Sequence, residues 1–149
     1  MTTELLSYWA GVRAGLLECI DRFDESQLGH TPFAGSWSAG EIMLHIADTE
    51  EGWFRYVARR ELDEWPSGFT LENYPTRSAI RQALSDVHRD AEQYLGQLSD
   101  SQLDGLIETP WGEEIQMRWI IWHVLEHEIH HRGELSLILG LLGREGLDV

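Results

Sequence analysis

The sequence predicts an all-α protein, an up-and-down four-helix bundle made by a single domain over residues 1–149. Four segments carry apolar residues at every third or fourth position, the links between them are short or moderate, and no convincing pair of strands is present. A chain of this length buries roughly 70% of its unfolded surface around one core, so no covalent staple is needed. The one cysteine, Cys19, excludes an intramolecular disulfide and is expected to be a small buried residue.

The first helix is expected over residues 4–23, where an apolar stripe repeats at helical spacing. Residues 24–37 contain Gly and Pro, and they are expected to form a connector across the end of the bundle. The second helix begins at Ser38, because the Ser38 hydroxyl and the Glu41 side chain can form a capping box. Its apolar stripe reaches Val57.

Residues 59–76 are rich in Pro, Gly and aromatic side chains, and we expect a long loop that covers one end of the bundle. The third helix follows over residues 77–98, with Thr76 as its N-cap. His88 lies off the apolar stripe of this helix, which predicts that its side chain is exposed.

The last helix is expected over residues 117–142, after a turn flanked by short extended pieces at 106–109 and 114–117. Apolar residues surround much of this helix, so we expect it to be the most buried element. Gly133 inside it costs about 1 kcal/mol relative to Ala, which indicates the close approach of another helix. Gly143 is suited to its C-terminal cap.

The formal net charge is −15, from 26 acidic and 11 basic residues, and every basic residue is Arg. Without lysine, the chain cannot form a Schiff base or a lysine-dependent phosphate loop. Its acidic surface is expected to repel nucleic acid and anionic lipid, so neither is an expected partner. No signal peptide or membrane span is recognisable, which predicts a cytoplasmic protein.

Four of the seven histidines lie in the last predicted helix. His123, His127 and His131 recur every four residues and share one face, whereas His130 projects about 100° away and is expected outside any site. His45 lies on the apolar side of the second helix, where a neutral imidazole needs a partner. We therefore expect His45, His127 and His131 to bind one metal ion, while the role of His123 stays open.

Three neutral imidazoles leave open coordination positions on a divalent ion, as in catalytic rather than closed structural sites. Zn, Ni, Fe(II) and Mn all accept this set of ligands. Such an ion lowers the pKa of bound water to about 7, or holds a thiol as thiolate, and so supplies a nucleophile. The carboxylates that could orient the imidazoles or move protons are Asp48, Glu126, Glu128 and Glu134.

Two other kinds of metal site share parts of this pattern. Residues 127–131 match His-Glu-x-x-His, the helix of zinc proteases in which Glu is the general base. However, Glu134 and Leu137 stand where the metzincin pattern needs Gly and His, and no sheet is predicted to hold a peptide. Glu128 and His131 match half of a di-iron carboxylate bundle, but the chain has no second Glu-x-x-His. Both interpretations are therefore disfavoured.

Residues 37–41, Trp-Ser-Ala-Gly-Glu, followed by His45, and residues 127–134 resemble the DinB-like family of metal-dependent four-helix bundles. The His-His-Arg-Gly segment near the end is the most specific part of a resemblance that spans nearly the whole chain. The family includes bacillithiol and mycothiol S-transferases and mycothiol-dependent maleylpyruvate isomerases. The resemblance implies a metal held by one His of the second helix and two of the fourth, which correspond here to His45, His127 and His131.

Together these features predict a metal-dependent enzyme that activates a thiol or water for transfer or hydrolysis on a small-molecule substrate. The alternative is a non-catalytic metal-binding or stress-response protein. The resemblance implies a low-molecular-weight thiol as co-substrate, although no basic cluster is present for a strongly anionic one. The arginines that could each serve singly are Arg55, Arg59, Arg60 and Arg132. Apolar runs at 137–139 and 141–142 exceed what one helix face buries, which favours a homodimer.

Overall fold

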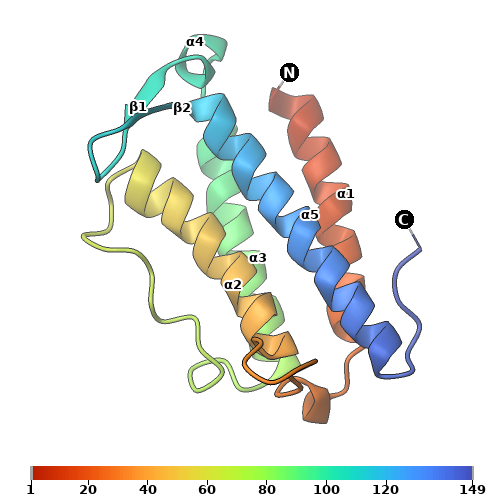
Figure 1. Cartoon of the computed structure of the whole chain (residues 1–149). Coiled ribbons are helices and arrows are strands. Elements are labelled where there is room, and N and C mark those ends of the chain that lie inside the picture. Colours follow the sequence, from red (N-terminus) through yellow and green to blue (C-terminus); the bar gives the residue numbers. More distant parts are fainter. Residues whose placement is uncertain (1, 149) are drawn as a thin grey trace.

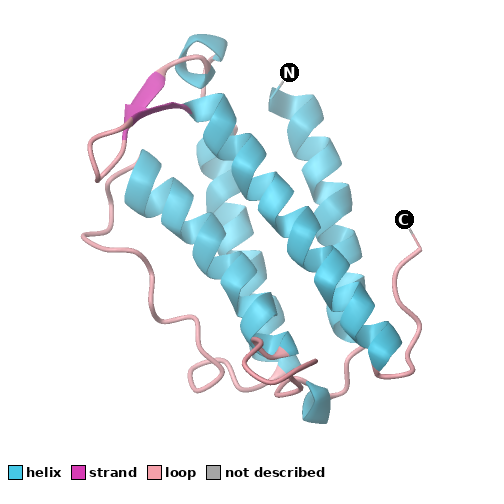
Figure 2. Ribbon diagram, viewed as in Figure 1, coloured by secondary structure: helices cyan, strands magenta, loops and turns pink. Residues whose placement is uncertain are grey.

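The computed structural model describes residues 2–148 and confirms an all-α four-helix bundle (Figures 1 and 2). The four long helices of this part of the chain are α1 (Thr2–Asp21), α2 (Ala39–Glu51), α3 (Arg77–Leu95) and α5 (Met117–Leu141). A π-helix, η2 (Gly52–Ala58), directly continues α2. The short elements are the 3-10 helix η1 (Glu25–Gln27), the helix α4 (Asp100–Leu103) and the strands β1 (Leu106–Glu108) and β2 (Glu114–Gln116).

The helix ends follow the local signals in the sequence. The Ser38 hydroxyl accepts from the Glu41 amide, and the Glu41 carboxylate accepts from the Ser38 amide at 2.7 Å, so the predicted capping box is confirmed. Thr76 caps α3 by accepting a hydrogen bond from the Ala79 amide. Gly143, with φ +73, adopts the left-handed conformation that ends α5.

The four long helices do not alternate in direction from each one to the next along the chain. α1 and α5 run one way, whereas α2 and α3 both run the other way (Figure 1). Because α2 and α3 are parallel neighbours, residues 59–76 must return along the length of the bundle, and the prediction that they cover one end is wrong. On this path Phe69 and Tyr74 pack on one part of the core and Trp65 packs on another.

The core consists of two apolar clusters with a layer of polar side chains between them. Each of the four long helices contributes one polar side chain to this layer. Arg13, Glu50, His88 and Glu128 form this polar layer, and each is at most 7% exposed. The prediction that His88 is exposed is wrong, because it follows Leu84 by one helical turn on the buried face. The apolar cluster towards one end includes Leu16, Ile46, Leu84 and Leu135, and the other includes Trp9, Phe54, Leu95 and Ile121.

Three further expectations change in detail. The most buried long helix is α2, with nine of 13 residues buried, rather than α5, with ten of 25. Close approach occurs at Gly52 rather than Gly133, since an added Cβ at Gly52 would lie 2.4 Å from the Trp65 ring, whereas nothing lies within 4 Å of one at Gly133. The expected extended pieces pair as a two-stranded antiparallel hairpin, β1 with β2.

Two other expectations hold in the part of the chain that the structure describes. Cys19 is completely buried, as predicted, and burial raises the pKa of its thiol to about 11. None of the described helices combines the length and apolarity that crossing a membrane would require.

Candidate metal centre

Three histidines from two antiparallel helices meet at one point on the side of the bundle. His127 and His131 stand one turn apart on α5, and His45 faces them from α2. The Nε2 atom of His127 lies 3.0 Å from Nε2 of His45 and 3.1 Å from Nε2 of His131. One donor atom from each ring therefore falls within 4.8 Å of the others, a spacing that fits a single ion.

The outward nitrogens of two of these rings contact carboxylates. Asp48 Oδ2 lies 3.2 Å from His45 Nδ1, and Glu134 Oε2 lies 2.6 Å from His131 Nδ1. An ionised carboxylate only accepts hydrogen bonds, so each Nδ1 carries the proton and each Nε2 keeps a free lone pair. If His127 Nε2 carries a proton, it can donate a good hydrogen bond to only one of the two facing Nε2 atoms, that of His45 or that of His131. The donor set is thus electron-rich at its centre and fits a cation.

Burial keeps the central rings neutral. It is the main cause that lowers the pKa of His127 to about 3, and the neighbouring imidazoles of His131 and His45 lower it further. The pKa of His131 is also lowered by burial, although Glu134 opposes the change. Neutral imidazole is the form that binds a metal, so the rings of His127 and His131 are in their ligand state at neutral pH.

Two tryptophan side chains lie close to the three histidines and to Asp48. The Trp37 ring, which is half exposed, lies 4.5 Å from the His45 ring between centroids and 6.4 Å from the His131 ring. The Trp65 indole donates to Asp48, with Nε1 to Oδ1 at 3.4 Å. The Trp65 ring is held against Gly52, so the loop of residues 59–76 contributes directly to the support of Asp48.

Other candidate residues lie outside the centre. Glu128 points into the bundle, where it contacts Trp9 and Arg13 and none of the three histidines, so it does not orient an imidazole. Glu126 is exposed on α5. His130 is exposed and lies 3.2 Å from Glu134, while His123 stacks on Trp119, with ring centroids 4.7 Å apart.

The polar layer was not anticipated from the sequence. Arg13 donates to Glu50 at 2.6 Å and to Glu128 at 2.9 Å, and the His88 Nδ1 atom lies 2.7 Å from Glu50. The Trp9 indole also donates to Glu128, at 2.7 Å. A signal was present, because Arg13 follows Trp9 at helical spacing within an apolar stripe, where a polar side chain must find buried partners.

The two buried carboxylates of this layer have different proton affinities. For Glu50, burial favours the neutral acid, but the Arg13 charge and the His88 hydrogen bond outweigh it and lower the pKa. For Glu128, burial dominates over Arg13, and the nearby Glu50 charge adds to it, so the pKa is raised. Arg13 is therefore the cation on which both carboxylates depend.

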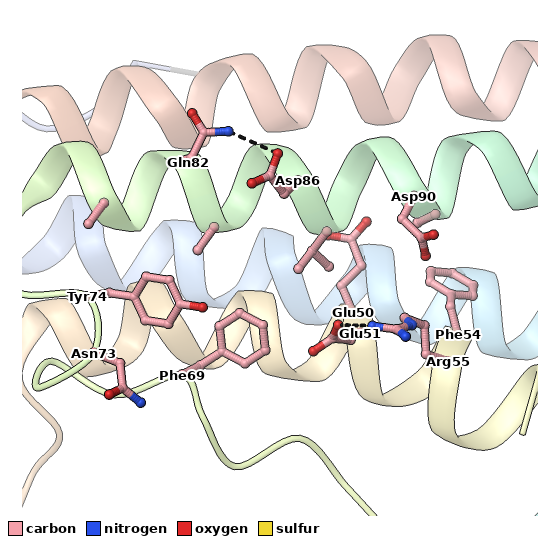
Figure 3. Close-up of a pocket in the computed structure, with 14 residues that line it drawn as sticks. Glu50, Glu51, Phe54, Arg55, Phe69, Asn73, Tyr74, Gln82, Asp86 and Asp90 are labelled. Atoms are coloured by element: carbon pink, nitrogen blue, oxygen red, sulfur yellow. Dashed lines mark hydrogen bonds and ion pairs between the residues drawn. The ribbon is translucent and has the colours of Figure 1, made fainter. Parts of the chain in front are cut away.

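A separate cavity of about 510 Å³ opens between α2, α3 and the loop of residues 59–76 (Figure 3). Two pairs of its polar side chains contact each other, Glu51 with Arg55 at 2.7 Å and Gln82 with Asp86 at 2.9 Å. None of the three clustered histidines lines this cavity, so it is not part of the candidate metal centre.

Acid should destabilise the metal-free protein partly through His127. In the unfolded chain this group takes up a proton near pH 6.5, whereas in the folded chain it resists protonation until about pH 3. Its contribution to stability is complete above pH 6.5 and is lost as the pH falls towards 3. Urea unfolding in chelator at pH 7.5 and 4.5 should show wild type losing on the order of 1 kcal/mol more than His127→Ala, after allowance for solvent screening. If wild type and His127→Ala lost equal stability between pH 7.5 and 4.5, protonation of His127 would not be a cause of the acid destabilisation.

Comparison with known proteins places the chain in a family. The model of the DinB superfamily matches residues 8–135. The chain belongs to the DinB superfamily. All three clustered histidines fall within the matched segment, as does the capping box that begins α2.

Three proteins of Bacillus subtilis resemble this superfamily member. The uncharacterized protein YjoA (strain 168) is 23% identical over 148 residues, which cover 98% of this chain and 94% of YjoA. Its crystal structure has a TM-score of 0.77 at 20% identity and covers 98% of this chain and 96% of that one. The uncharacterized protein YizA (strain 168) is 28% identical over 97 residues, 64% of this chain but only 58% of YizA.

YfiT of the same organism is described as a probable metal-dependent hydrolase with an unusual four-helix bundle topology. Its structure has a TM-score of 0.67 at 22% identity and covers 93% of this chain and 87% of YfiT. The structural likenesses to YjoA and YfiT show that this chain shares their four-helix bundle fold.

Proposed function

We propose that this protein is a metal-dependent enzyme that uses His45, His127 and His131 to bind one divalent ion and to activate water or a thiol. The reaction is transfer or hydrolysis on a small-molecule substrate. One observation carries the proposal: three Nε2 atoms converge while carboxylates occupy the Nδ1 side of two of the rings. The description of YfiT as a probable metal-dependent hydrolase supports the same class of reaction.

The donor set fits an ion with catalytic rather than purely structural coordination. His45, His127 and His131 would supply three imidazole ligands to a Zn²⁺ ion and would leave a position for water or a substrate, and Ni, Fe(II) and Mn also accept such ligands. A divalent ion held there supplies Lewis acidity, which generates a nucleophile from water or a thiol near neutral pH.

The protein's own groups then orient and flank the site. Asp48 and Glu134 hold the Nδ1 protons of His45 and His131 and so fix both rings. The Glu134 side chain is 41% exposed, which allows it to exchange a proton with solvent or substrate. The Trp37 ring packs against the His45 ring and forms one wall beside the three histidines. Cys19 has no part in the chemistry, because it is completely buried and has a raised pKa.

Elemental analysis of untagged protein tests the centre. Wild type should bind about one zinc or nickel ion per chain, and His45→Ala should bind none, because that variant breaks the link between α2 and α5. His130→Ala is the matched control and should bind like wild type, since His130 is exposed and is not one of the three histidines whose donor atoms converge. A wild type that takes up no ion after incubation with either metal would overturn the proposal.

A substrate screen separates catalysis from passive binding. Metal-loaded wild type should turn over a thiol with an electrophile such as monochlorobimane, or hydrolyse activated esters, and folded His127→Ala should not. A centre that binds metal and raises the melting temperature, yet gives no turnover in this screen, would instead identify a non-catalytic metal-binding or stress-response protein.

A further inference from the structure

A groove runs along the surface from the histidine cluster to the end of α5. It lies between the connector that precedes α2 and the last turns of α5, and its volume is about 530 Å³. One end is formed by His131 and by Trp37, whose ring also contacts His45. The groove is therefore continuous with the proposed metal centre. The side chains that line its length are Phe33, Trp37, Ile42, Leu137 and Leu141.

The walls of the groove are apolar and yet exposed. Phe33 is 69% exposed, Leu137 66% and Leu141 65%, whereas most large apolar side chains of the described chain are packed in its two core clusters. Exposed apolar side chains gathered in one concave surface are typical of a ligand site. Among the described residues that line the groove, Glu134 is the one with a formal charge, and its carboxylate already contacts His131 and His130.

We propose that this groove binds the apolar part of an uncharged substrate, an alkyl or acyl chain or an aryl group, whose polar reacting end lies at the three histidines. This inference rests on the proposed function, because it uses the metal centre as the reacting end of the groove. An apolar chain gains free energy from burial against Phe33, Leu137 and Leu141. A substrate with an anionic tail is disfavoured by Glu134 and by the net charge of −15.

The shape of the groove favours a small molecule over a protein partner. Its volume of about 530 Å³ lies within the range of pockets that hold drug-sized ligands. The groove is hollow and ends at chemically reactive groups, whereas a face that pairs with a protein is filled by side chains of the partner. A second copy of this chain seated here would close the approach to His131.

Straight-chain hydroxamic acids test the inference, because they join a head that binds zinc as the hydroxamate anion to an uncharged alkyl chain of variable length. Dissociation constants of acetohydroxamate through octanohydroxamate would be measured by calorimetry on the zinc-loaded, untagged protein. Each added methylene group should tighten binding about two- to fourfold if it is buried in the groove. The six added methylene groups should therefore give a gain in affinity of about 60- to 4,000-fold from end to end.

Two matched variants locate the effect. Leu137→Glu should abolish the gain in affinity with chain length, because Leu137 lines the groove and the variant places a charge on its apolar wall. Leu106→Glu places the same charge on another exposed leucine, 57% exposed on β1, and should behave like wild type. Both positions are exposed, so neither variant disturbs the packed core.

The outcomes separate the groove from the centre. If acetohydroxamate binds zinc-loaded wild type but longer chains bind no better, the groove proposal is overturned and the metal centre stands. If longer chains bind better in both wild type and His127→Ala, while acetohydroxamate binds neither, the groove is supported and the proposed function fails. If light scattering shows a dimer that Leu137→Glu dissociates, and chain length has no effect, a second copy occupies the groove and the proposal is overturned.

Discussion

Replacing Arg13 with methionine should lower the free energy of unfolding by about 3–5 kcal/mol. The Arg13 guanidinium lies between Glu50 and Glu128, and both carboxylates are only 1% exposed. Without the cation, two carboxyl groups remain buried next to each other with no positive charge to offset their loss of water. Urea unfolding at pH 7.5 would measure the change, and Arg89→Met is the control for an exposed pair, with an expected change within about 0.5 kcal/mol.

A combined variant shows whether the charged layer as a whole stabilises the fold relative to apolar side chains, or whether Arg13 only offsets the cost of burying the two carboxylates. Arg13→Met together with Glu50→Leu and Glu128→Met removes all three charges at similar volume. It should recover only part of the stability that the single variant loses, because no buried charge is left to desolvate but the Trp9 indole and the His88 ring lose their carboxylate partners. A loss below about 1 kcal/mol in the single variant would mean that water reaches the layer, contrary to its burial in the structure.

Replacing Asp48 with asparagine should weaken zinc binding by about 10–100-fold, the usual effect of losing a carboxylate behind a metal-binding imidazole. The carboxylate holds the proton on His45 Nδ1 and so directs the Nε2 lone pair towards the other two rings. A neutral amide stabilises this arrangement less. Competition of the protein against a zinc-chelating dye would measure the dissociation constants of wild type and variant.

Two further variants test the specificity of this effect. Glu126→Gln is the matched control, since it also neutralises a carboxylate but at an exposed position of α5. Trp65→Phe should change affinity in the same direction as Asp48→Asn by a smaller factor, because it removes the indole that approaches Asp48. Equal zinc affinity in wild type and Asp48→Asn would show that His45 is held by other groups.

Regular spacing explains why much of the fold and the meeting of the histidines could be anticipated. Apolar stripes located the helices, and short capping motifs at Ser38 and Thr76 located two of their starts to the residue. His127 and His131 share a face of any helix because they are four residues apart. The carboxylates that contact the rings, Asp48 and Glu134, each follow their histidine by three residues, so local geometry also brought them within reach.

Contacts between side chains of different helices could not be predicted from the local spacing of residues in the sequence. Glu128 is adjacent to His127 in the sequence, but successive residues of a helix point about 100° apart, and the position of Trp9 and Arg13 decides which partners Glu128 meets. His88 is buried because Glu50, on another helix, supplies a partner. The path of residues 59–76 depends on the parallel directions of α2 and α3, which no local pattern specifies.

The separation of the three histidines along the chain also sets an order of events during biosynthesis. His45 and His127 are 82 residues apart, and they come from the second and the last of the long helices. A nascent chain on the ribosome therefore presents α1, α2 and α3 before two of the three imidazoles have been translated. Capture of an ion by the proposed triad would follow the docking of α5, and loading with metal would then be limited to chains that have nearly finished folding.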